Sequence, residues 1–129
     1  MSILDYNLDN VPDEQTVEGG EYNVKILSAQ PKDSKAGKPM IALVLGFTDV
    51  PDSKSCFHYL SLPSDGDEQT AINGKLRRLK NFYEAFGVDY SGPVEMDNLV
   101  GETAFAIVDE EENEEFGARN NIKRFLAQK

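Results

Sequence analysis

Hydrophobic and polar residues alternate over residues 21–29, and strict alternation is typical of a strand with one buried face. Residues 31–38 interrupt this pattern with a polar, lysine-rich segment, which predicts a loop. Residues 39–47 are apolar at nearly every position, as expected for a strand covered on both sides or bent at Gly46. Residues 56–62 complete a group of three predicted strands.

A helix is predicted next, because apolar residues recur at intervals of three and four and so share one face. These residues are Ile72, Leu76, Leu79, Tyr83 and Phe86. Two overlapping pairs have the spacing of a capping box near its start, Ser64 with Asp67 and Asp65 with Glu68. Gly87 predicts its end, since glycine readily adopts the left-handed conformation that closes a helix.

Two more strands are predicted after the helix. Residues 102–110 and 118–127 carry strand patterns, and the acidic residues 111–117 between them predict a turn. Three strands, a helix and two strands is the element order of the five-stranded Greek-key barrel called the OB-fold. We therefore expect a mainly β protein with an OB-like barrel and its helix between the third and fourth strands, although other small α+β sandwiches share this order.

The chain has 129 residues, 40% of them hydrophobic, which fits one domain. Residues 1–20 show no sustained period and predict an N-terminal arm, which leaves residues 21–129 as the single OB-like domain. The start lacks the features of a signal peptide, and no run approaches the roughly 20 apolar residues of a membrane helix. We therefore expect a cytoplasmic protein with no membrane partner.

Charge is segregated along the chain, although its formal net value is −10. Residues 1–21 hold six acids and no base, and residues 89–115 hold ten acids and no base. Residues 22–48 and 70–88 carry net positive charge, and residues 116–129 hold four bases and no acid. A folded domain of this kind presents a basic face beside acidic segments, and a polyanion responds to that local potential rather than to the total.

Catalysis has no residue constellation to support it. We expect His58 to be packed or at the surface and the lone Cys56 to fill the core. Residues 109–115, DEEENEE, lack the spacing and glycine of a calcium loop, and SKAGK at residues 34–38 lacks the pattern of a phosphate-binding loop. We therefore expect a protein that is not an enzyme and that uses neither a metal nor a cofactor.

Basic residues near the first two strands favour nucleic-acid binding instead. In an OB-fold the second and third strands, with loops 1–2 and 4–5, form the groove for single strands. The predicted loop 1–2 supplies Lys32, Lys35 and Lys38, and the first strand offers Lys25 outward. Phosphates attract lysine and arginine while every base has a face that stacks, so a basic track with aromatic platforms binds without reading sequence.

Three further groups of residues have two interpretations each. Phe57 and Tyr59 share one face of the third strand, where they either stack on bases or face inward as core. The helix bases either join the track or form an ordinary solvated surface, and those of the last strand either contact DNA or protect an edge strand by charge. The helix bases are Lys75, Arg77, Arg78 and Lys80, and the strand bases are Arg119, Lys123 and Arg124.

Four segments together carry a family resemblance. They are GEYNVKILSAQPKDSKAGKPMIALVL, KLRRLKNFYEAFG, LVGETAFAIV and FGARNNIKRFLA. In this order, and with the start LDYNLDNVP, the chain resembles over nearly its full length a family of short phage proteins long catalogued as a domain of unknown function. That family is found among phage recombination and replication genes and is regarded as binding single-stranded DNA.

The resemblance implies an OB-like fold and coating of single strands without sequence reading, in the cytoplasm of a host cell. The positions that match the basic pattern of the family are Lys35, Gly37, Lys38, Arg77, Arg78, Arg119, Lys123 and Arg124. Residues and resemblance together predict a DNA-binding set of Lys25, Lys35, Lys38, Phe57, Tyr59, Arg77, Arg78, Arg119, Lys123 and Arg124.

Two hypotheses from different classes follow. The first is a non-catalytic single-stranded DNA-binding protein of phage replication or recombination, whose acidic segment 109–115 docks phage or host replication and recombination proteins. The second is an acidic interaction protein, a phage DNA mimic or inhibitor that occupies the DNA groove of a host protein. The order of the strands, the segregated basic segments and the resemblance make the first the leading hypothesis, and the charge of −10 and the acid-only residues 89–115 motivate the second. The oligomeric state is left open, a homo-oligomer included.

Overall fold

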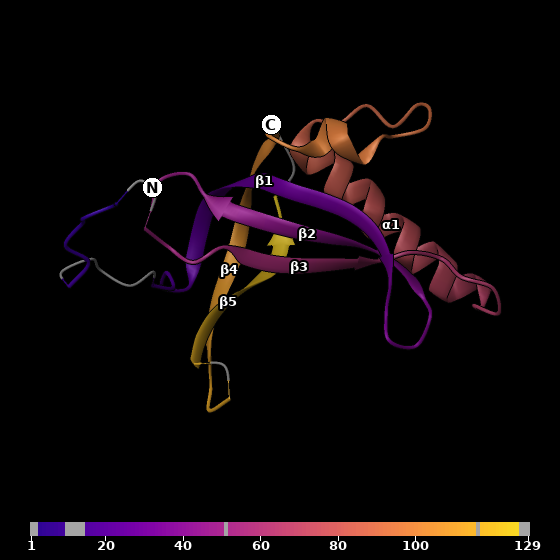
Figure 1. Cartoon of the computed structure of the whole chain (residues 1–129). Helices are drawn as coiled ribbons and strands as arrows, with labels where there is room; N and C mark the ends of the chain where they lie inside the picture. Colours follow the sequence, from indigo (N-terminus) through magenta and orange to yellow (C-terminus); the bar gives the residue numbers. More distant parts are fainter. Residues whose placement is uncertain (1–2, 10–14, 51, 116, 127–129) are drawn as a thin grey trace.

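Five strands, one long helix and one short 3₁₀ helix make up the computed structural model, which describes residues 3–9, 15–50, 52–115 and 117–126 (Figure 1). The elements are β1 (Gly20–Asp33), β2 (Pro39–Phe47), β3 (Cys56–Ser61), α1 (Gln69–Phe86), η1 (Met96–Leu99), β4 (Thr103–Asn113) and β5 (Gly117–Phe125). In Figure 1 the strands β1, β2 and β3 cross β4 and β5, so that the sheet curls round on itself.

The sheet order is β3-β2-β1-β4-β5, and every paired neighbour is antiparallel. The two ends of this order, β3 and β5, also lie against each other, which nearly closes the sheet into a barrel. The helix α1 lies between β3 and β4 in the chain. The predicted fold, a mainly β protein with an OB-like five-stranded barrel, is therefore confirmed.

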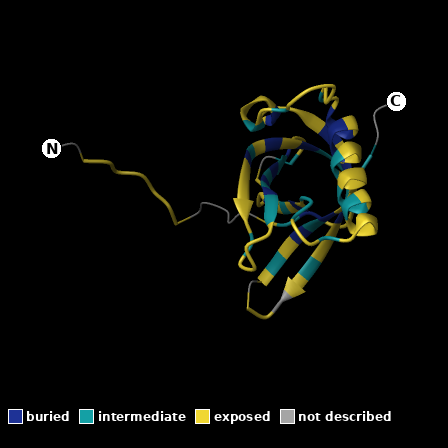
Figure 2. Ribbon diagram, turned by 90° about the vertical axis from the view of Figure 1, so that its right-hand side faces the viewer, coloured by how far each residue is buried: buried dark blue, intermediate teal, exposed yellow. Residues whose placement is uncertain are grey.

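Alternation along the strands builds the core, because one parity of each strand points into the barrel. On β2 the inward residues Ile41, Leu43 and Leu45 are buried, while the outward ones between them are half-buried. On β1 the side chains of Val24 and Ile26 are fully buried. Figure 2 shows stretches of buried residues around the ring of strands and on the helix beside it.

The helix α1 closes one end of the barrel with its C-terminal half, where the buried residues are Phe82, Tyr83, Ala85 and Phe86. Phe82 and Phe86 contact the ring of Phe125 on β5, with centroid distances of 5.5 and 5.2 Å. The predicted stripe was wrong at Leu76, which is exposed, and it missed Phe82. Gly87 ends the helix at φ 70°, as predicted.

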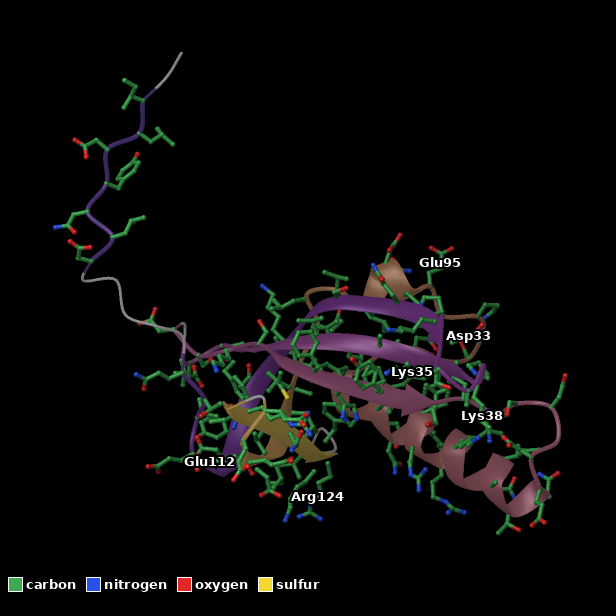
Figure 3. All side chains as sticks on the ribbon, turned by 60° about the horizontal axis from the view of Figure 1, so that its bottom comes forward. Asp33, Lys35, Lys38, Glu95, Glu112 and Arg124 are labelled. Carbon is green, nitrogen blue, oxygen red and sulfur yellow. The ribbon has the colours of Figure 1, made fainter. Side chains whose placement is uncertain are left out.

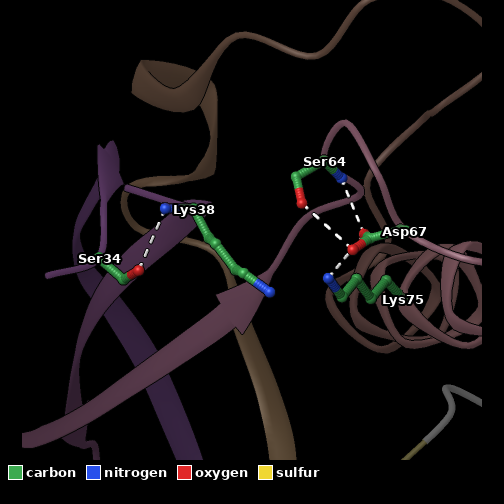
Figure 4. Close-up of polar contacts among 5 residues, drawn as sticks. All are labelled: Ser34, Lys38, Ser64, Asp67 and Lys75. Atoms are coloured by element: carbon green, nitrogen blue, oxygen red, sulfur yellow. Dashed lines mark hydrogen bonds and ion pairs between the residues drawn. The ribbon is translucent and has the colours of Figure 1, made fainter. Parts of the chain in front are cut away.

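The start of α1 differs from the predicted capping box. The N-cap is Glu68, whose side chain makes no capping hydrogen bond. Asp67 instead accepts a hydrogen bond from the Ser64 amide at 2.9 Å and an ion pair from Lys75 at 2.8 Å (Figure 4). Asp67 therefore links the turn before the helix, through Ser64, to the second turn of the helix, through Lys75.

Two predicted loops are shorter than expected because strand pairing extends into them. β1 continues to Asp33, which pairs with Pro39, so the first hairpin loop comprises only residues 34–38. β4 continues to Asn113, which pairs with Gly117, so most of the predicted acidic turn is strand. Gly37 and Gly117 have φ of 77° and 71°, which suits tight turns.

Part of the predicted N-terminal arm is attached to the barrel. Gln15 forms a parallel bridge with Ser53, and the buried Val17 exchanges two backbone-to-side-chain hydrogen bonds with Asn120 on β5. Residues 1–2 and 10–14 of the arm, and Ala127 at the end of the predicted last strand, lie outside the described residues. No helix in the described part of the chain is long and apolar enough to cross a membrane.

Candidate nucleic-acid interface

Phe57 and Tyr59 point out of the barrel. Alternation along β3 turns Cys56, His58 and Leu60 to one side, with Cys56 and Leu60 buried. Phe57 and Tyr59 have the opposite parity and face away from the core, and their side chains are 61% and 53% exposed. Of the two interpretations of this pair, core or platform, the structure supports the outward one.

The two strands at the ends of the sheet order meet through side chains. Within the described residues, no backbone pairing joins β3 to β5. The Cys56 thiol donates to the Asn120 carbonyl at 3.2 Å, and the His58 ring packs edge-on against Phe125 at a centroid distance of 5.3 Å. The barrel therefore has a seam where backbone groups of both strands lack strand partners.

A groove follows this seam. Its larger part, about 820 Å³, is lined by Lys54, Ser55, Phe57, His58, Tyr59, Ala118, Arg119, Asn120, Asn121 and Ile122. A smaller part, about 370 Å³, shares His58 and Tyr59 and continues towards α1; its other lining residues are Leu60, Ser61, Arg78, Asn81, Phe82, Lys123, Arg124 and Phe125. We call the two parts together the β3–β5 groove.

The described residues that line the β3–β5 groove include five bases and no acid: Lys54, Arg78, Arg119, Lys123 and Arg124. A β-bulge shapes one end, because Ile122 and Arg124 pair with consecutive residues of β4 and Lys123 is the extra residue. Bulges re-aim side chains in this way, and Lys123 and Arg124 are both exposed although they are adjacent in sequence. The groove thus combines positive charge with two exposed rings.

Two of these bases already have acidic neighbours on β4. Arg119 lies 3.4 Å from Glu111, and Lys123 lies 3.4 Å from Asp109. All four side chains are about half exposed, and ion pairs of this kind contribute about 0–1 kcal/mol each in water. A phosphate can therefore replace either carboxylate at small cost.

The remaining predicted site residues lie outside the β3–β5 groove. Lys35 and Lys38 are on the first hairpin loop, where the Lys38 amide donates to the Ser34 hydroxyl at 3.2 Å. Figure 3 shows these two lysines together near the hairpin tip and Arg124 apart from them. Lys25 pairs with Gly46 and Thr103, so β2 separates its strand from β3. Arg77 is exposed on α1 and does not line the groove.

Lys32 connects the hairpin side to the groove. Pairing extends β1 through this residue, and its ammonium lies 5.9 Å from the centroid of the Tyr59 ring. At that distance the ring attracts the cation weakly. Lys32 therefore adds positive charge on the outer face beside the groove, from a strand position rather than from the predicted loop.

Burial shifts the pKa of Cys56 and of His58. Burial raises the pKa of the Cys56 thiol to about 11, so at neutral pH it is a protonated, unreactive thiol that fills the core as predicted. Burial also lowers the pKa of His58, which favours its neutral form. Among the described residues, no cluster of three or more His, Cys, Asp or Glu side chains has the geometry to hold a metal ion.

A comparison with protein-family models shows the family of this chain. The model described as "Protein of unknown function (DUF669)" matches residues 4–125. The chain belongs to this family. Its description assigns no function, so the link between DUF669 and single-stranded DNA remains a prediction from the sequence resemblance. A search of the curated proteins found no match.

Sequence reasoning missed three residues that shape this DUF669 groove. Lys54 lies in the turn before β3, where a single base among acids gave no pattern. Asn121 donates to Glu111, and the buried Asn120 holds Val17, which fixes the root of the arm beside the groove. Asparagine on a strand carries no distinctive pattern, so only the packing identifies these two.

Proposed function

We propose that this DUF669 protein binds single-stranded DNA along the β3–β5 groove without reading its sequence and without catalysing a reaction. The observation that carries the proposal is the groove itself, which places two exposed aromatic rings among five bases and no lining acid within the described residues. The lysine and arginine side chains would contact the phosphates of the strand, and the rings of Phe57 and Tyr59 would stack on its nucleobases.

The chemistry of the groove favours single strands over duplex. In a duplex the base faces are covered by their neighbours, so exposed rings have nothing to stack on. A single strand offers those faces, and each stacked base contributes about 1–3 kcal/mol. Because stacking and phosphate contacts are alike for all bases, the affinity should depend little on sequence.

The biological setting comes from the resemblance alone. It supports a role in phage replication or recombination, where single strands are exposed and must be coated. Residues 109–113 of the acidic segment proposed to dock other replication proteins lie in β4, beside the groove rather than in a separate loop. Partners held there would sit next to the bound strand.

Fluorescence anisotropy with labelled oligonucleotides tests the proposal. We expect single strands of different sequence to bind alike and matched duplex to bind more weakly. The logarithm of the binding constant should fall linearly with the logarithm of salt concentration, with a slope of about −3.5 if each of the five bases neutralises one phosphate. Affinity that ignores salt, or a preference for duplex, would contradict the proposal.

The same experiment separates the rival function. Exposed acids on the β4–β5 hairpin, Glu112 and Glu114 among them, are the feature that a DNA mimic would use. A mimic should ignore oligonucleotides and bind a basic DNA-binding protein instead. Absence of single-strand binding together with such an interaction would favour the acidic interaction protein.

A further inference from the structure

The smaller part of the β3–β5 groove, about 370 Å³, ends against the helix α1, and we call it the α1 pocket. The helix contacts both β3 and β5, and in Figure 1 the arrow of β3 ends beside it. Arg78, Asn81 and Phe82 of the helix line the pocket together with the ends of the two strands. The pocket thus has walls from three elements, and a single strand that follows the groove must end or turn away there.

The α1 pocket gathers positive charge from two of these elements. Arg78 comes from α1, and Lys123 and Arg124 come from β5, where both are exposed at the bulge. Ser61 of β3 and Asn81 of α1 add side chains that can donate hydrogen bonds. Among the described residues, no acid lines this pocket. Its lining is therefore that of a site for an anion.

Most of this positive charge is not neutralised by neighbours. Within the described residues, Arg78 and Arg124 take part in no ion pair. The residues three and four positions from Arg78 on the helix are not acidic, and Arg124 pairs across the sheet with Ile107. Lys123 lies 3.4 Å from Asp109, in an exposed pair that another anion can replace at small cost. The pocket can therefore offer all three cations to one ligand.

A phosphomonoester suits the α1 pocket better than an internal phosphodiester does. An internal phosphate of a strand carries one negative charge, whereas a terminal phosphate carries about −1.5 to −2 at pH 7 and has three strong acceptor oxygens. The planar guanidinium of arginine binds such oxygens in pairs. Two arginines and a lysine match this larger charge, and a terminal group needs no room for the strand to continue past α1.

We propose that the α1 pocket binds the phosphate at one end of a single strand that lies in the β3–β5 groove. Tyr59 lines both this pocket and the larger part of the groove, so its ring would stack on a nucleobase near that end. The two ends of the groove differ, so only one end of a bound strand reaches the pocket. This inference rests on the proposed function and adds to it a preference for strand ends that carry a phosphate.

Isothermal titration calorimetry of the full chain with short, unlabelled single strands tests the inference. The strands share one sequence of about eight nucleotides, a length that one OB-fold can cover. They carry hydroxyl groups at both ends, a phosphate at the 5′ end, or a phosphate at the 3′ end. We expect one phosphorylated strand to bind about three- to tenfold more tightly than the hydroxyl strand, because it adds exposed charge contacts in the pocket. The other should bind like the hydroxyl strand.

Substitutions show whether the α1 pocket causes this gain. Arg78→Gln/Arg124→Gln removes two exposed cations of the pocket and should abolish the gain. The control Arg77→Gln changes the exposed neighbour on α1 that does not line the groove, and should keep both the affinity and the gain. Lys54→Gln changes the larger part of the groove, so it should weaken the binding of all three strands alike and leave the gain intact.

The hydroxyl strand separates this inference from the proposed function. Binding of the hydroxyl strand without a gain from either phosphate would overturn the inference alone. Equal gains from both phosphates, or a gain that persists in Arg78→Gln/Arg124→Gln, would show that the α1 pocket does not hold the phosphate, and would also overturn it. Absence of binding by all three strands would overturn the proposed function and this inference with it.

Discussion

Phe57 and Tyr59 keep large rings in contact with solvent, although Cys56 and Leu60 beside them are buried. We predict that Phe57→Ala and Tyr59→Ala each weaken single-strand binding by about 1–3 kcal/mol, because each removes a stacking surface. Neither change should alter the free energy of unfolding by more than about 0.5 kcal/mol, since little buried area is lost. Anisotropy titration and urea denaturation measure the two effects.

Phe105 provides the matched control for these rings. It is 51% exposed on β4, outside the β3–β5 groove, so Phe105→Ala removes a similar area of exposed ring. Its affinity for single strands should equal that of the wild type. Equal losses in all three variants would show that stacking is not localised to the groove.

Asp67 gives a residue-scale prediction for stability. The Lys75 ammonium, and next the Ser64 amide, hold the pKa of Asp67 at about 2, below its ordinary value of 3.8. Because the folded pKa is the lower one, the carboxylate stabilises the fold above 3.8, and this contribution is lost as pH falls through about 2. Asp67→Asn should therefore be less stable than the wild type at neutral pH, and the gap should close towards pH 2.

Urea denaturation across that pH range checks the prediction. Asp65→Asn is the control, because this exposed neighbour has no ion pair among the described residues and should show a small, flat difference. A gap between Asp67→Asn and the wild type that stays constant with pH would mean that the carboxylate does not act through its charge.

At the scale of elements, the β4–β5 hairpin holds acidic residues that would oppose the proposed binding of DNA. Asp109 on β4 lies 3.4 Å from Lys123 on β5 and neutralises part of its charge. We predict that Asp109→Asn strengthens single-strand binding by up to about 1 kcal/mol, or fivefold, and steepens the salt dependence. The control Glu95→Gln removes one exposed acidic residue far from the groove. It should change the affinity and its salt dependence less than Asp109→Asn does.

Anisotropy at low salt is the measurement, since screening hides such pairs at high salt. Equal gains from the two substitutions would indicate a response to net charge alone. A loss of affinity in Asp109→Asn would indicate that the carboxylate positions Lys123 rather than competing for it.

Element types and their order could be predicted from the sequence because alternation and helical spacing are local properties. The ends of β1 and β4 could not, because Asp33 and Asn113 join their strands by pairing with residues across a turn. The buried face of α1 was also displaced: Phe82 meets Phe125 at the end of the barrel, while Leu76 is exposed on the N-terminal half of the helix. Such contacts depend on how far the barrel extends.

At the scale of the whole molecule, the site depends on the sheet order. The order β3-β2-β1-β4-β5 puts β3 and β5 at the two ends of the sheet, and the curl of the sheet brings these ends side by side. Phe57 and Tyr59 therefore line one groove with Arg119, which is more than fifty residues away in the sequence. Residue type alone selected Lys25 and Lys35 equally, and the fold places both outside the groove. The sequence indicated the kinds of residue that the proposed function needs, but it could not show which of them lie together in the groove.

The net charge of −10 is compatible with the proposed function, because a single strand would respond to the local potential of the groove rather than to the total charge. Two acidic residues of β4, Glu111 and Asp109, lie next to Arg119 and Lys123 of the groove. The acidic residues within residues 3–9 lie on a segment that projects away from the barrel. The five lysine and arginine residues of the groove therefore make its local potential positive, although the net charge of the chain is negative.

Nuclear magnetic resonance mapping with a short single strand tests the central claim most directly. Titration of the isotope-labelled protein should shift the amide resonances of residues 54–59 and 118–125 first and furthest, together with those around Arg78. Resonances of the first hairpin loop and of Lys25 should move little. Shifts confined to residues 25–38, or spread evenly over the surface, would contradict binding in the β3–β5 groove.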